Sequence, residues 1–491
     1  MSNRENLPVY LGAALASLLL SAWQISGVAQ INHDAVYYLQ AIQGDAESIR
    51  QIGNWLLYSR LIQGIHLLFD LGLEHAAWLL NTLLDTLLVL AFMRLIEELE
   101  GNRRTLIWAA VLVLSLPYLN DNRAEIIRDH GYWAFSLVAM ISFLRLFRAF
   151  SWRSLLAWNL SMLIATLFRV EGAVFIAFMP FALLLNTSQP WQQRFRNTAS
   201  ALLPVAVAVA ALALTMSFSS GFQNRLDDLI AKIGGLLSIF RDIIPTKAAL
   251  LTRGVIPQFS QSTAEASIYL GVLYSILKDL VSSLSWLYFA ILVLRRWFPA
   301  PALPQHARRV IGFYAAISFL ILFLHGAQHF VMVSRYTVSL ALMLLVIVVF
   351  SLDELQRRMA REPTFKPLIA VVGICILLLF ADSLISSSRP KVYILDAARW
   401  AQKNLPDQAR VLTDYHPERV GYYSNRHNSR HYDFERYRPA STSIEDFDYA
   451  FVRTRKGRAT SKLQQLLYKK QLQPVKKIST DQQGVIIYKL R

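Results

Sequence analysis

One carboxylate stands where it could do chemistry: Asp34, in the stretch QINHDAVYYLQAIQ (30–43), which follows an uncharged apolar run. At the outer mouth of a membrane-crossing segment, a carboxylate can reach both water and a substrate held in the membrane. Ionisable groups at membrane depth cost free energy and are therefore functional candidates. The alternative is that Asp34 is the N-cap of the helix DAVYYLQAI and accepts hydrogen bonds from its free backbone amides. Position alone leaves both interpretations open.

Charged residues also gather at two other places where apolar runs begin. The stretch LNDNRAEIIRDHGYW (119–133) brings Glu125, Arg128 and Asp129 to the start of one run. The stretch LFRVEGAVF (167–175) places Arg169 and Glu171 between two runs with no room for a loop. Uncompensated charge at these depths is costly. These residues therefore either contact a substrate or form structural ion pairs with one another.

A further stretch, HGAQHFVMVSRYTVSLALM (325–343), ends one apolar run with His325 and His329 and begins the next with Arg335 and Tyr336. A guanidinium can hold a phosphate by paired hydrogen bonds, so Arg335 is a candidate anion-binding residue. The alternative is an arginine whose alkyl stem lies along the bilayer while its charge reaches the headgroups.

The composition indicates a membrane protein, because 54% of the 491 residues are hydrophobic and only 17% are charged. The run 7–29 has no charge and, at about 1.5 Å per residue, can cross a ~30 Å hydrocarbon core. It is longer than the apolar region of a signal peptide and further apolar runs follow, so we expect an uncleaved anchor. The single cysteine, Cys375, excludes an intramolecular disulfide.

The net charge of +17 could suit a nucleic-acid-binding protein, but its distribution indicates a membrane topology instead. Lys and Arg in short loops between apolar runs mark the cytoplasmic side. Such clusters lie at 103–104, 145–153, 194–196, 295–296, 308–309 and 357–366. All of them fall on one side if the N-terminus is cytoplasmic and the chain crosses the membrane eleven times, at 7–29, 76–96, 105–119, 131–147, 154–168, 172–185, 198–218, 268–294, 310–325, 336–352 and 367–385.

The opposite side then carries the long outer loops 30–75, 119–130 and 219–267. Within them, 55–73 and 221–244 have apolar residues at helical spacing, which predicts amphipathic helices on the membrane surface or, for 221–244, a packed loop helix broken at Gly234 and Gly235.

The last hundred residues predict a different kind of structure. Strand-like runs at 410–414, 420–424, 448–453, 475–479 and 484–490 alternate with helical patterns at 392–404 and 461–471. We expect an α-helical polytopic membrane domain over 1–388 and a small outer α/β domain over 389–491. The excess of basic over acidic residues in the predicted outer domain is also compatible with contact to anionic membrane lipids.

Together these features resemble the GT-C glycosyltransferases, and more narrowly the bacterial members related to protein O-mannosyltransferases and aminoarabinose transferases. The resemblance rests on Asp34 one turn past the first span with aromatic residues after it, an amphipathic first outer loop, RVEG before the sixth span, SRY at the start of a late span, and the outer stretch ARVLTDYHPERVGYYSNR. It covers most of the chain through the topology, although each motif is short.

The resemblance implies an enzyme of the bacterial inner membrane that moves a sugar from a polyprenyl phosphate to a lipid, glycan or protein acceptor on the periplasmic face, usually with inversion. Asp34 matches the first-loop aspartate that takes the acceptor proton or holds a metal. Arg335, with Arg128 and Arg169 behind it, is implied to neutralise the lipid phosphate. Glu125 or Asp129 are candidates for positioning hydroxyl groups, and Tyr336 or Tyr37 for contacting the sugar.

Two departures from the family pattern bear on metal binding. The first-loop aspartate is preceded by His33 and followed by Ala35 instead of belonging to an acidic pair, and NWLLYSR stands where a Pro-rich signature is common. His33 and Asp34 could hold a divalent ion, but the sequence offers no third ligand.

Two other functions remain as alternatives. A transporter would place charges in mid-span and show internal repeats, whereas these charges lie near the outer ends and no repeat is evident. A polymerase or ligase of surface polysaccharide usually carries its large loop between late spans, whereas here the largest outer segment is the C-terminal tail.

Overall fold

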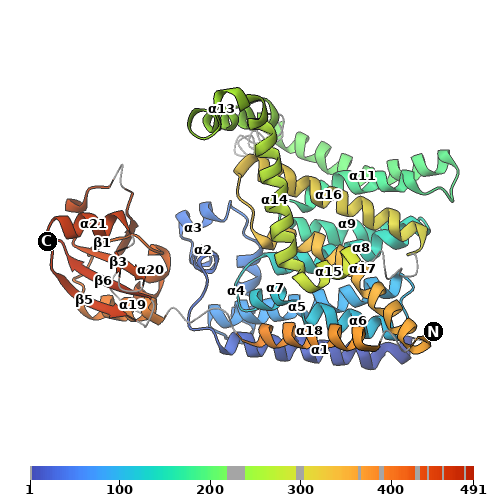
Figure 1. Cartoon of the computed structure of the whole chain (residues 1–491), viewed down its shortest axis with the longest axis horizontal. Helices are drawn as coiled ribbons and strands as arrows, with labels where there is room; N and C mark the ends of the chain where they lie inside the picture. Colours follow the sequence, from blue (N-terminus) through green and yellow to red (C-terminus); the bar gives the residue numbers. More distant parts are fainter. Residues whose placement is uncertain are drawn as a thin grey trace. The chain divides into compact units, whose positions relative to one another are not determined.

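The computed structural model describes residues 3–217, 238–294, 303–362, 366–385, 392–425, 432–438, 442–455, 458–459, 461–479 and 483–491. The chain divides into two compact units (Figure 1). The first, called the helical unit here, comprises 1–21, 82–122 and 128–385. The second, called the mixed unit, comprises 22–81, 123–127 and 386–491, so residues of the predicted first outer loop belong to the same compact unit as the C-terminal residues.

The described part of the helical unit consists of helices. Two helices, α1 (Asn3–Ser26) and α5 (Leu73–Glu98), have residues in both units. The others are α6 (Arg103–Leu114), α7 (Pro117–Asn122), α8 (Asp129–Arg148), α9 (Trp152–Phe168), α10 (Gly172–Phe178), η1 (Met179–Leu185), α11 (Trp191–Ser217), η2 (Ile239–Ile243), α13 (Ile244–Gly254), η3 (Gln258–Thr263), α14 (Ala264–Leu284), α15 (Trp286–Leu294), α16 (Gln305–His329), α17 (Ser334–Arg361) and α18 (Lys366–Leu384).

Within the described residues, seven helices are long and apolar enough to cross a membrane: α1, α5, α8, α14, α16, α17 and α18. The other predicted spans also coincide with helices: α6, α9, α10 with η1, and α11. The side chains in the second half of α11 lie outside the described residues. The predicted fold class, an α-helical polytopic protein with a small C-terminal α/β region, is confirmed.

Two predicted spans are interrupted, each for a local reason. The run 105–119 ends as a helix at Leu114 because Pro117 lacks a backbone N–H and disfavours helical geometry in the residue before it. The run 268–294 breaks at Ser285, whose φ of +72° leaves the helical region. The Ser285 hydroxyl then accepts a long hydrogen bond from the amide of Tyr288, 3.5 Å away, and so caps the next helix, α15.

The helices differ in how much of their apolar surface the protein covers. In α8 and α17, 83% of the most apolar stretch is buried, whereas in α18 only 17% is. Large apolar side chains of α18 such as Val371, Leu377 and Leu378 are more than half exposed. A helix that is apolar on all sides requires either a protein core or a lipid environment. Helices α8 and α17 therefore form the core, and α18 is suited to face lipid.

Ion pairs hold the helix ends that carry the predicted cytoplasmic clusters. Glu98, at the end of α5, accepts hydrogen bonds from Arg94, Arg145 and Arg148. On the neighbouring pair of helices, Asp353 of α17 binds Arg104 and Arg357. Both carboxylates are nearly inaccessible to solvent. The clustered arginines therefore fix the ends of α5, α6, α8 and α17 as well as carrying charge.

We expect Glu98→Gln to lower the stability of the helical unit by roughly 2 kcal/mol, because three guanidinium groups lose their shared carboxylate. The measurement is the unfolding temperature of the protein in detergent, followed by tryptophan fluorescence. Glu354→Gln is the matched control, since Glu354 contacts one partly exposed arginine and its loss should change little. Equal unfolding temperatures for Glu98→Gln and wild type would contradict this role.

The mixed unit contains the helices of the predicted first outer loop and the C-terminal α/β region. The loop helices are α2 (His33–Ile42), α3 (Ala46–Gln51) and α4 (Leu57–Phe69), so the predicted amphipathic helix at 55–73 is present. Near the end of α4, Leu67, Leu68 and Phe69 are exposed, as an amphipathic helix at a membrane surface requires.

The C-terminal region contains a mixed sheet. Its elements are α19 (Val392–Asn404), β1 (Arg410–Thr413), α20 (Pro417–Asn425), β2 (Asp433–Arg436), η5 (Ile444–Asp446), β3 (Tyr449–Arg455), β4 (Arg458–Ala459), α21 (Lys462–Lys469), β5 (Pro474–Ser479) and β6 (Gln483–Lys489). The strand order is β2-β1-β3-β6-β5, with β4 paired to β3. Strand β1 is parallel to β2 and β3, and β6 is antiparallel to β3 and β5.

Alternate residues of the strands contribute to two separate hydrophobic cores. On one face, Val411, Phe451 and Ile487 pack with apolar residues of α19 and α20. On the other face, Leu412 and Val452 pack with Leu463 and Leu467 of α21. Because side chains alternate across a strand, one pattern of apolar residues supports both layers of helix.

One prediction for this region is wrong: the run VGYYS (420–424), expected to be a strand, lies in helix α20. Its buried residues Pro417, Val420 and Ser424 recur at helical and not alternating spacing. Pro417 at the first helical position and Glu418 in the first turn are helix-start signals. The other predicted strands and helices of the region are confirmed, whereas β2 and β4 were not predicted. Most of the predicted helix at 221–244, including Gly234 and Gly235, lies outside the described residues.

Candidate functional site

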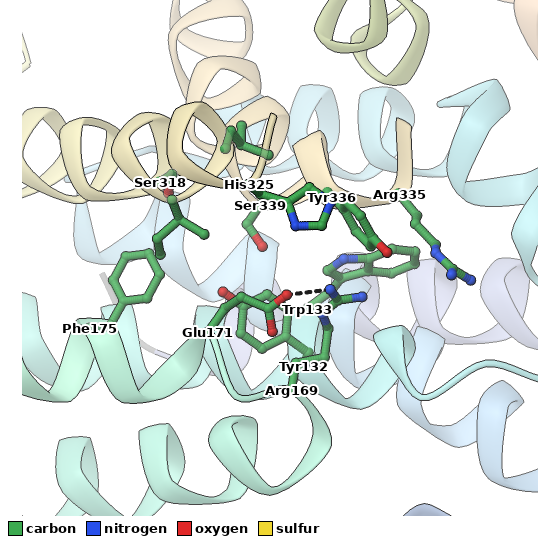
Figure 2. Close-up of a pocket in the computed structure, with 12 residues that line it drawn as sticks. Tyr132, Trp133, Arg169, Glu171, Phe175, Ser318, His325, Arg335, Tyr336 and Ser339 are labelled. Atoms are coloured by element: carbon green, nitrogen blue, oxygen red, sulfur yellow. Dashed lines mark hydrogen bonds and ion pairs between the residues drawn. The ribbon is translucent and has the colours of Figure 1, made fainter. Parts of the chain in front are cut away.

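A pocket lined by both charged and apolar side chains lies in the helical unit where several helices begin or end (Figure 2). It is formed by the start of α8, the junction between α9 and α10, the end of α16 and the start of α17. Its lining residues are Tyr132, Trp133, Arg169, Glu171, Phe175, Ser318, Ile321, Leu322, His325, Arg335, Tyr336 and Ser339.

Arg169 connects most of the charged groups at this pocket. Its guanidinium forms ion pairs with Asp129 at the start of α8 and with Glu171 just before α10. It also lies over the ring of Tyr336, 4.5 Å from the ring centre (Figure 2). Arg169 and Asp129 are both buried. The structural ion pairing that the sequence left open is therefore formed.

The local sequence explains how Arg169 reaches this position. Helix α9 ends at Phe168, and Arg169 adopts an extended backbone conformation, with φ −145° and ψ 128°. Glycines allow the flanking segments to approach closely. A Cβ on Gly131 would lie 2.4 Å from the ring of Phe168, and one on Gly172 would lie 2.5 Å from the Thr166 hydroxyl. No larger residue fits at either position without displacing the junction between α9 and α10.

Arg335 and Tyr336 enter the pocket from the first turn of α17. The guanidinium of Arg335 lies 5.5 Å from the Tyr336 ring centre, on the ring that Arg169 also contacts. The ring of His325, near the end of α16, meets Tyr336 edge-on at 4.9 Å. One tyrosine thus brings two arginines from distant parts of the sequence to the same pocket (Figure 2). Both arginines line the pocket, with the Arg335 side chain directed away from Arg169 in Figure 2, and a guanidinium group is suited to bind a phosphate.

A second buried pair in the helical unit was missed from the sequence. His130 lies at the start of α8, and its Nδ1 is 2.7 Å from Asp85 in the middle of α5. Both side chains are almost completely buried. The signal was a carboxylate in the middle of an apolar span, TLLDTLLVL, which in a membrane requires a partner. This pair joins α5 to the start of α8.

Asp34 lies in the mixed unit, in the first turn of α2. The alternative interpretation of Asp34 as the N-cap is wrong, because the N-cap residue is Asn32. The Asn32 side chain does not cap the helix: its Oδ1 accepts from the Ile126 amide at 2.8 Å and its Nδ2 donates to the Ile126 carbonyl at 3.2 Å. This exchange ties the start of α2 to 123–127. Asp34 is half-buried and lies in the first turn of α2, at the positive end of the helix dipole.

Glu418, at the start of α20, interacts with two predicted site residues of α2. The Tyr37 hydroxyl donates to Glu418 Oε1 at 3.3 Å, and His33 Nδ1 lies 3.4 Å from Glu418 Oε2. Burial and the negative charge of Glu418 raise the pKa of Tyr37 to about 12. Burial alone would raise the pKa of Glu418, but the His33 imidazole, the backbone amide and Arg436 together lower it. Glu418 is therefore charged at neutral pH.

The predicted site residues fall into two groups. Arg128, Asp129, Arg169, Glu171, Arg335 and Tyr336 belong to the helical unit, where the last five make the contacts described above and Arg128 directly precedes Asp129. His33, Asp34, Tyr37 and Glu125 belong to the mixed unit. Among these, His33 and Tyr37 share Glu418, whereas the backbone carbonyl of Glu125 accepts from Asn81 at 2.8 Å.

Comparison with known proteins identifies the fold. No protein-family model and no curated protein matches the sequence. The archaeal oligosaccharyltransferase AglB from Archaeoglobus fulgidus, solved with an inhibitory peptide and a dolichol-phosphate, is similar over 91% of this chain and 69% of its own, with a TM-score of 0.53 and 15% identity. The same organism's oligosaccharyltransferase solved with Zn and sulfate matches over 90% and 67%, with a TM-score of 0.52 and 14% identity.

A third similar structure is ArnT from Cupriavidus metallidurans in the apo state, which matches over 98% of this chain and 97% of its own. Its TM-score is 0.42 and its identity is 12%. The chain shares its fold with the two oligosaccharyltransferase structures. The chain has the GT-C fold that the sequence predicts.

Proposed function

We propose that this protein is a membrane glycosyltransferase that moves a sugar from a polyprenyl phosphate to an acceptor on the periplasmic face of the bacterial inner membrane. The observation that carries the proposal is the pocket with Arg169 and Arg335, placed at helix ends in a chain with the GT-C fold. A dolichol-phosphate, which is a polyprenyl phosphate, is bound in the similar AglB structure and supports the choice of donor.

The positions of the charges support this orientation. The pocket lies at the beginnings of α8 and α17, whereas Arg145, Arg148 and Arg357 lie in the last turns or the second half of the same helices. Helix α8 has 20 residues and is therefore about 30 Å long, close to the thickness of a hydrocarbon core. Since arginines in short loops favour the cytoplasm, the pocket end is assigned to the periplasmic side. The N-terminus is then cytoplasmic.

Binding of the donor phosphate is assigned first to Arg335. Arg169 already pairs with Asp129 and Glu171, so most of its charge is compensated within the protein. Arg335 shares the Tyr336 ring with Arg169 and lines the pocket. Its guanidinium would neutralise the phosphate as negative charge develops on the leaving oxygen. Tyr336 and His325 are placed to contact the same group or the sugar.

Proton removal from the acceptor is assigned to Asp34. As the acceptor oxygen forms a bond to the sugar C1, the bond from C1 to the phosphate oxygen breaks and polyprenyl phosphate leaves. The hydroxyl proton passes to the Asp34 carboxylate. Attack from the face opposite the phosphate inverts the configuration at C1. The exposed apolar end of α4 and the basic C-terminal region are assigned to contacts with membrane lipid and acceptor.

The experiment that tests the proposal is sugar transfer by the purified chain in membranes supplied with radiolabelled polyprenyl-phosphate sugars. Lipid, glycan and protein fractions are separated after the reaction, so that the label reports the acceptor class. Transfer from at least one donor is expected. Absence of transfer from every donor of a broad panel, with a folded protein, would count against a glycosyltransferase.

Arg335→Gln is expected to raise the KM for the donor and to lower kcat/KM roughly ten- to hundredfold, as for loss of a hydrogen bond to a charged group. Donors that lack most of the lipid should show the same ten- to hundredfold decrease in kcat/KM with Arg335→Gln, because the proposed contact of Arg335 is with the phosphate and not with the lipid. Arg153→Gln is the control, because Arg153 is exposed in a predicted cytoplasmic cluster and its loss changes net charge equally. If the KM for the donor is unchanged in Arg335→Gln, Arg335 does not bind the donor phosphate.

A further inference from the structure

Three side chains with metal-ligand chemistry meet in the mixed unit: His33 at the start of α2, His416 just before α20, and Glu418 in the first turn of α20. One ligand atom from each lies within 4.8 Å of the other two. The sequence suggested His33 and Asp34 as a pair of ligands. The structure instead combines His33 with two residues nearly four hundred positions away.

The separation of the best-defined pair fits a shared ion. His33 Nδ1 and Glu418 Oε2 are 3.4 Å apart, and both atoms are buried without a hydrogen-bond partner in the part of the chain that the structure describes. Ligands bound tetrahedrally to zinc at about 2.0–2.1 Å are separated by about 3.3–3.4 Å. The two atoms are therefore spaced as neighbours in a coordination sphere, with geometry that does not satisfy a direct hydrogen bond.

The backbone holds the other ligand in an unusual conformation. His416 has a φ of +44°, a left-handed geometry that few residues with a side chain adopt. Pro417 follows it and begins α20, which fixes the direction of the chain between His416 and Glu418. The rings of His33 and His416 lie 5.7 Å apart between centres. Backbone strain of this kind is often found where side chains are held in a functional arrangement.

A second layer of contacts orients the ligands. The Tyr37 hydroxyl donates to Glu418 Oε1, which leaves Oε2 directed toward His33. The Tyr37 ring also meets the His33 ring edge-on, with 5.1 Å between centres. Partners of this kind fix the rotamers of ligating residues and tune metal affinity.

We propose that His33, His416 and Glu418 bind a divalent transition metal of the zinc class. Two imidazoles and one carboxylate suit zinc better than magnesium or calcium, which prefer oxygen ligands. Three protein ligands leave the fourth position for water or a substrate oxygen. Such an ion joins the helix that carries Asp34 to the C-terminal α/β region. This proposal does not depend on the proposed sugar transfer.

The test uses the full-length protein in detergent, freed of metal with a chelator and then titrated with Zn²⁺. Bound metal is measured by elemental analysis after equilibrium dialysis, and Co²⁺ reports the coordination geometry through its visible absorption. His416→Asn and Glu418→Gln are the ligand variants. Asn is chosen at 416 because it tolerates left-handed backbone geometry, so the fold is retained while the imidazole is removed.

One equivalent of metal is expected to be lost, or its affinity lowered at least tenfold, in both ligand variants. Tyr37→Phe should weaken binding by about ten- to hundredfold without changing the number of sites. His66→Gln is the control, because His66 lies in the same unit and contacts the Leu71 carbonyl instead of this cluster. Zn²⁺ should also raise the unfolding temperature of wild type more than that of the ligand variants.

Equal metal content and affinity in wild type, His416→Asn and Glu418→Gln would overturn the proposal. It would then follow that His33 and Glu418 form only an ion pair between α2 and α20. Binding of Mg²⁺ in preference to Zn²⁺ would also overturn it, because that selectivity contradicts the two imidazole ligands.

Discussion

Asp34→Asn is expected to reduce sugar transfer by a factor of about 10² to 10⁴ while leaving the protein folded and the donor bound. The variant keeps the shape of the side chain and removes its basicity. Since Asn32 is the N-cap residue, the amide at position 34 should disturb α2 little. The loss should therefore appear in kcat and not in the KM for the donor. Initial rates over a range of donor concentrations measure both constants.

Two comparisons make this prediction specific. Asp34→Glu keeps a carboxylate but moves it by one methylene, so partial activity is expected. Asp70→Asn removes a carboxylate from the same unit, at the left-handed end of α4, where Asn is well tolerated. It should transfer sugar at the rate of wild type.

Full activity of Asp34→Asn would mean that another group takes the proton. The sequence offers Glu125, Asp129 and Glu171 as substitutes. Asp129 and Glu171 both form ion pairs with Arg169, so each carboxylate is already engaged by a cation within the protein. Glu125, in the same unit as Asp34, would then be the first residue to replace.

The sequence predicted the helices well because membrane spans are read from local composition. A run without charge, such as 7–29, has few alternatives to a helix in a bilayer, and basic residues mark one end of each span. The same local signals predicted that Arg169 and Glu171 stand at a junction between helices. They also predicted Arg335 and Tyr336 at the start of a helix.

Pairings between distant residues could not be predicted in this way. His130 with Asp85, and His33 with Glu418, are separated by 45 and 385 positions, and no local periodicity encodes which partner is chosen. The run VGYYS illustrates a related limit. Its β-branched and aromatic residues favour a strand, but packing of Val420 and Ser424 at helical spacing decided the structure.

Arg169→Gln is expected to destabilise the helical unit by about 3 to 5 kcal/mol, because it leaves the carboxylates of Asp129 and Glu171 without their cation. The Tyr336 ring also loses one of its two cationic neighbours. Thermal unfolding in detergent measures the stability. Arg169→Lys keeps the charge but cannot bind two carboxylates in the planar geometry of a guanidinium, so an intermediate loss is expected.

A double variant separates the structural role of Arg169 from a role in binding donor. Replacing Asp129 by Asn together with Arg169→Gln removes the buried charge that the single variant leaves unpaired. If the arginine is structural, the double variant should regain part of the lost stability and bind donor as wild type does, because Arg335 remains. If Arg169 contacts the phosphate, stability should recover while the donor KM stays raised. Stability that does not recover would contradict the pairing of Asp129 with Arg169 as the source of the loss.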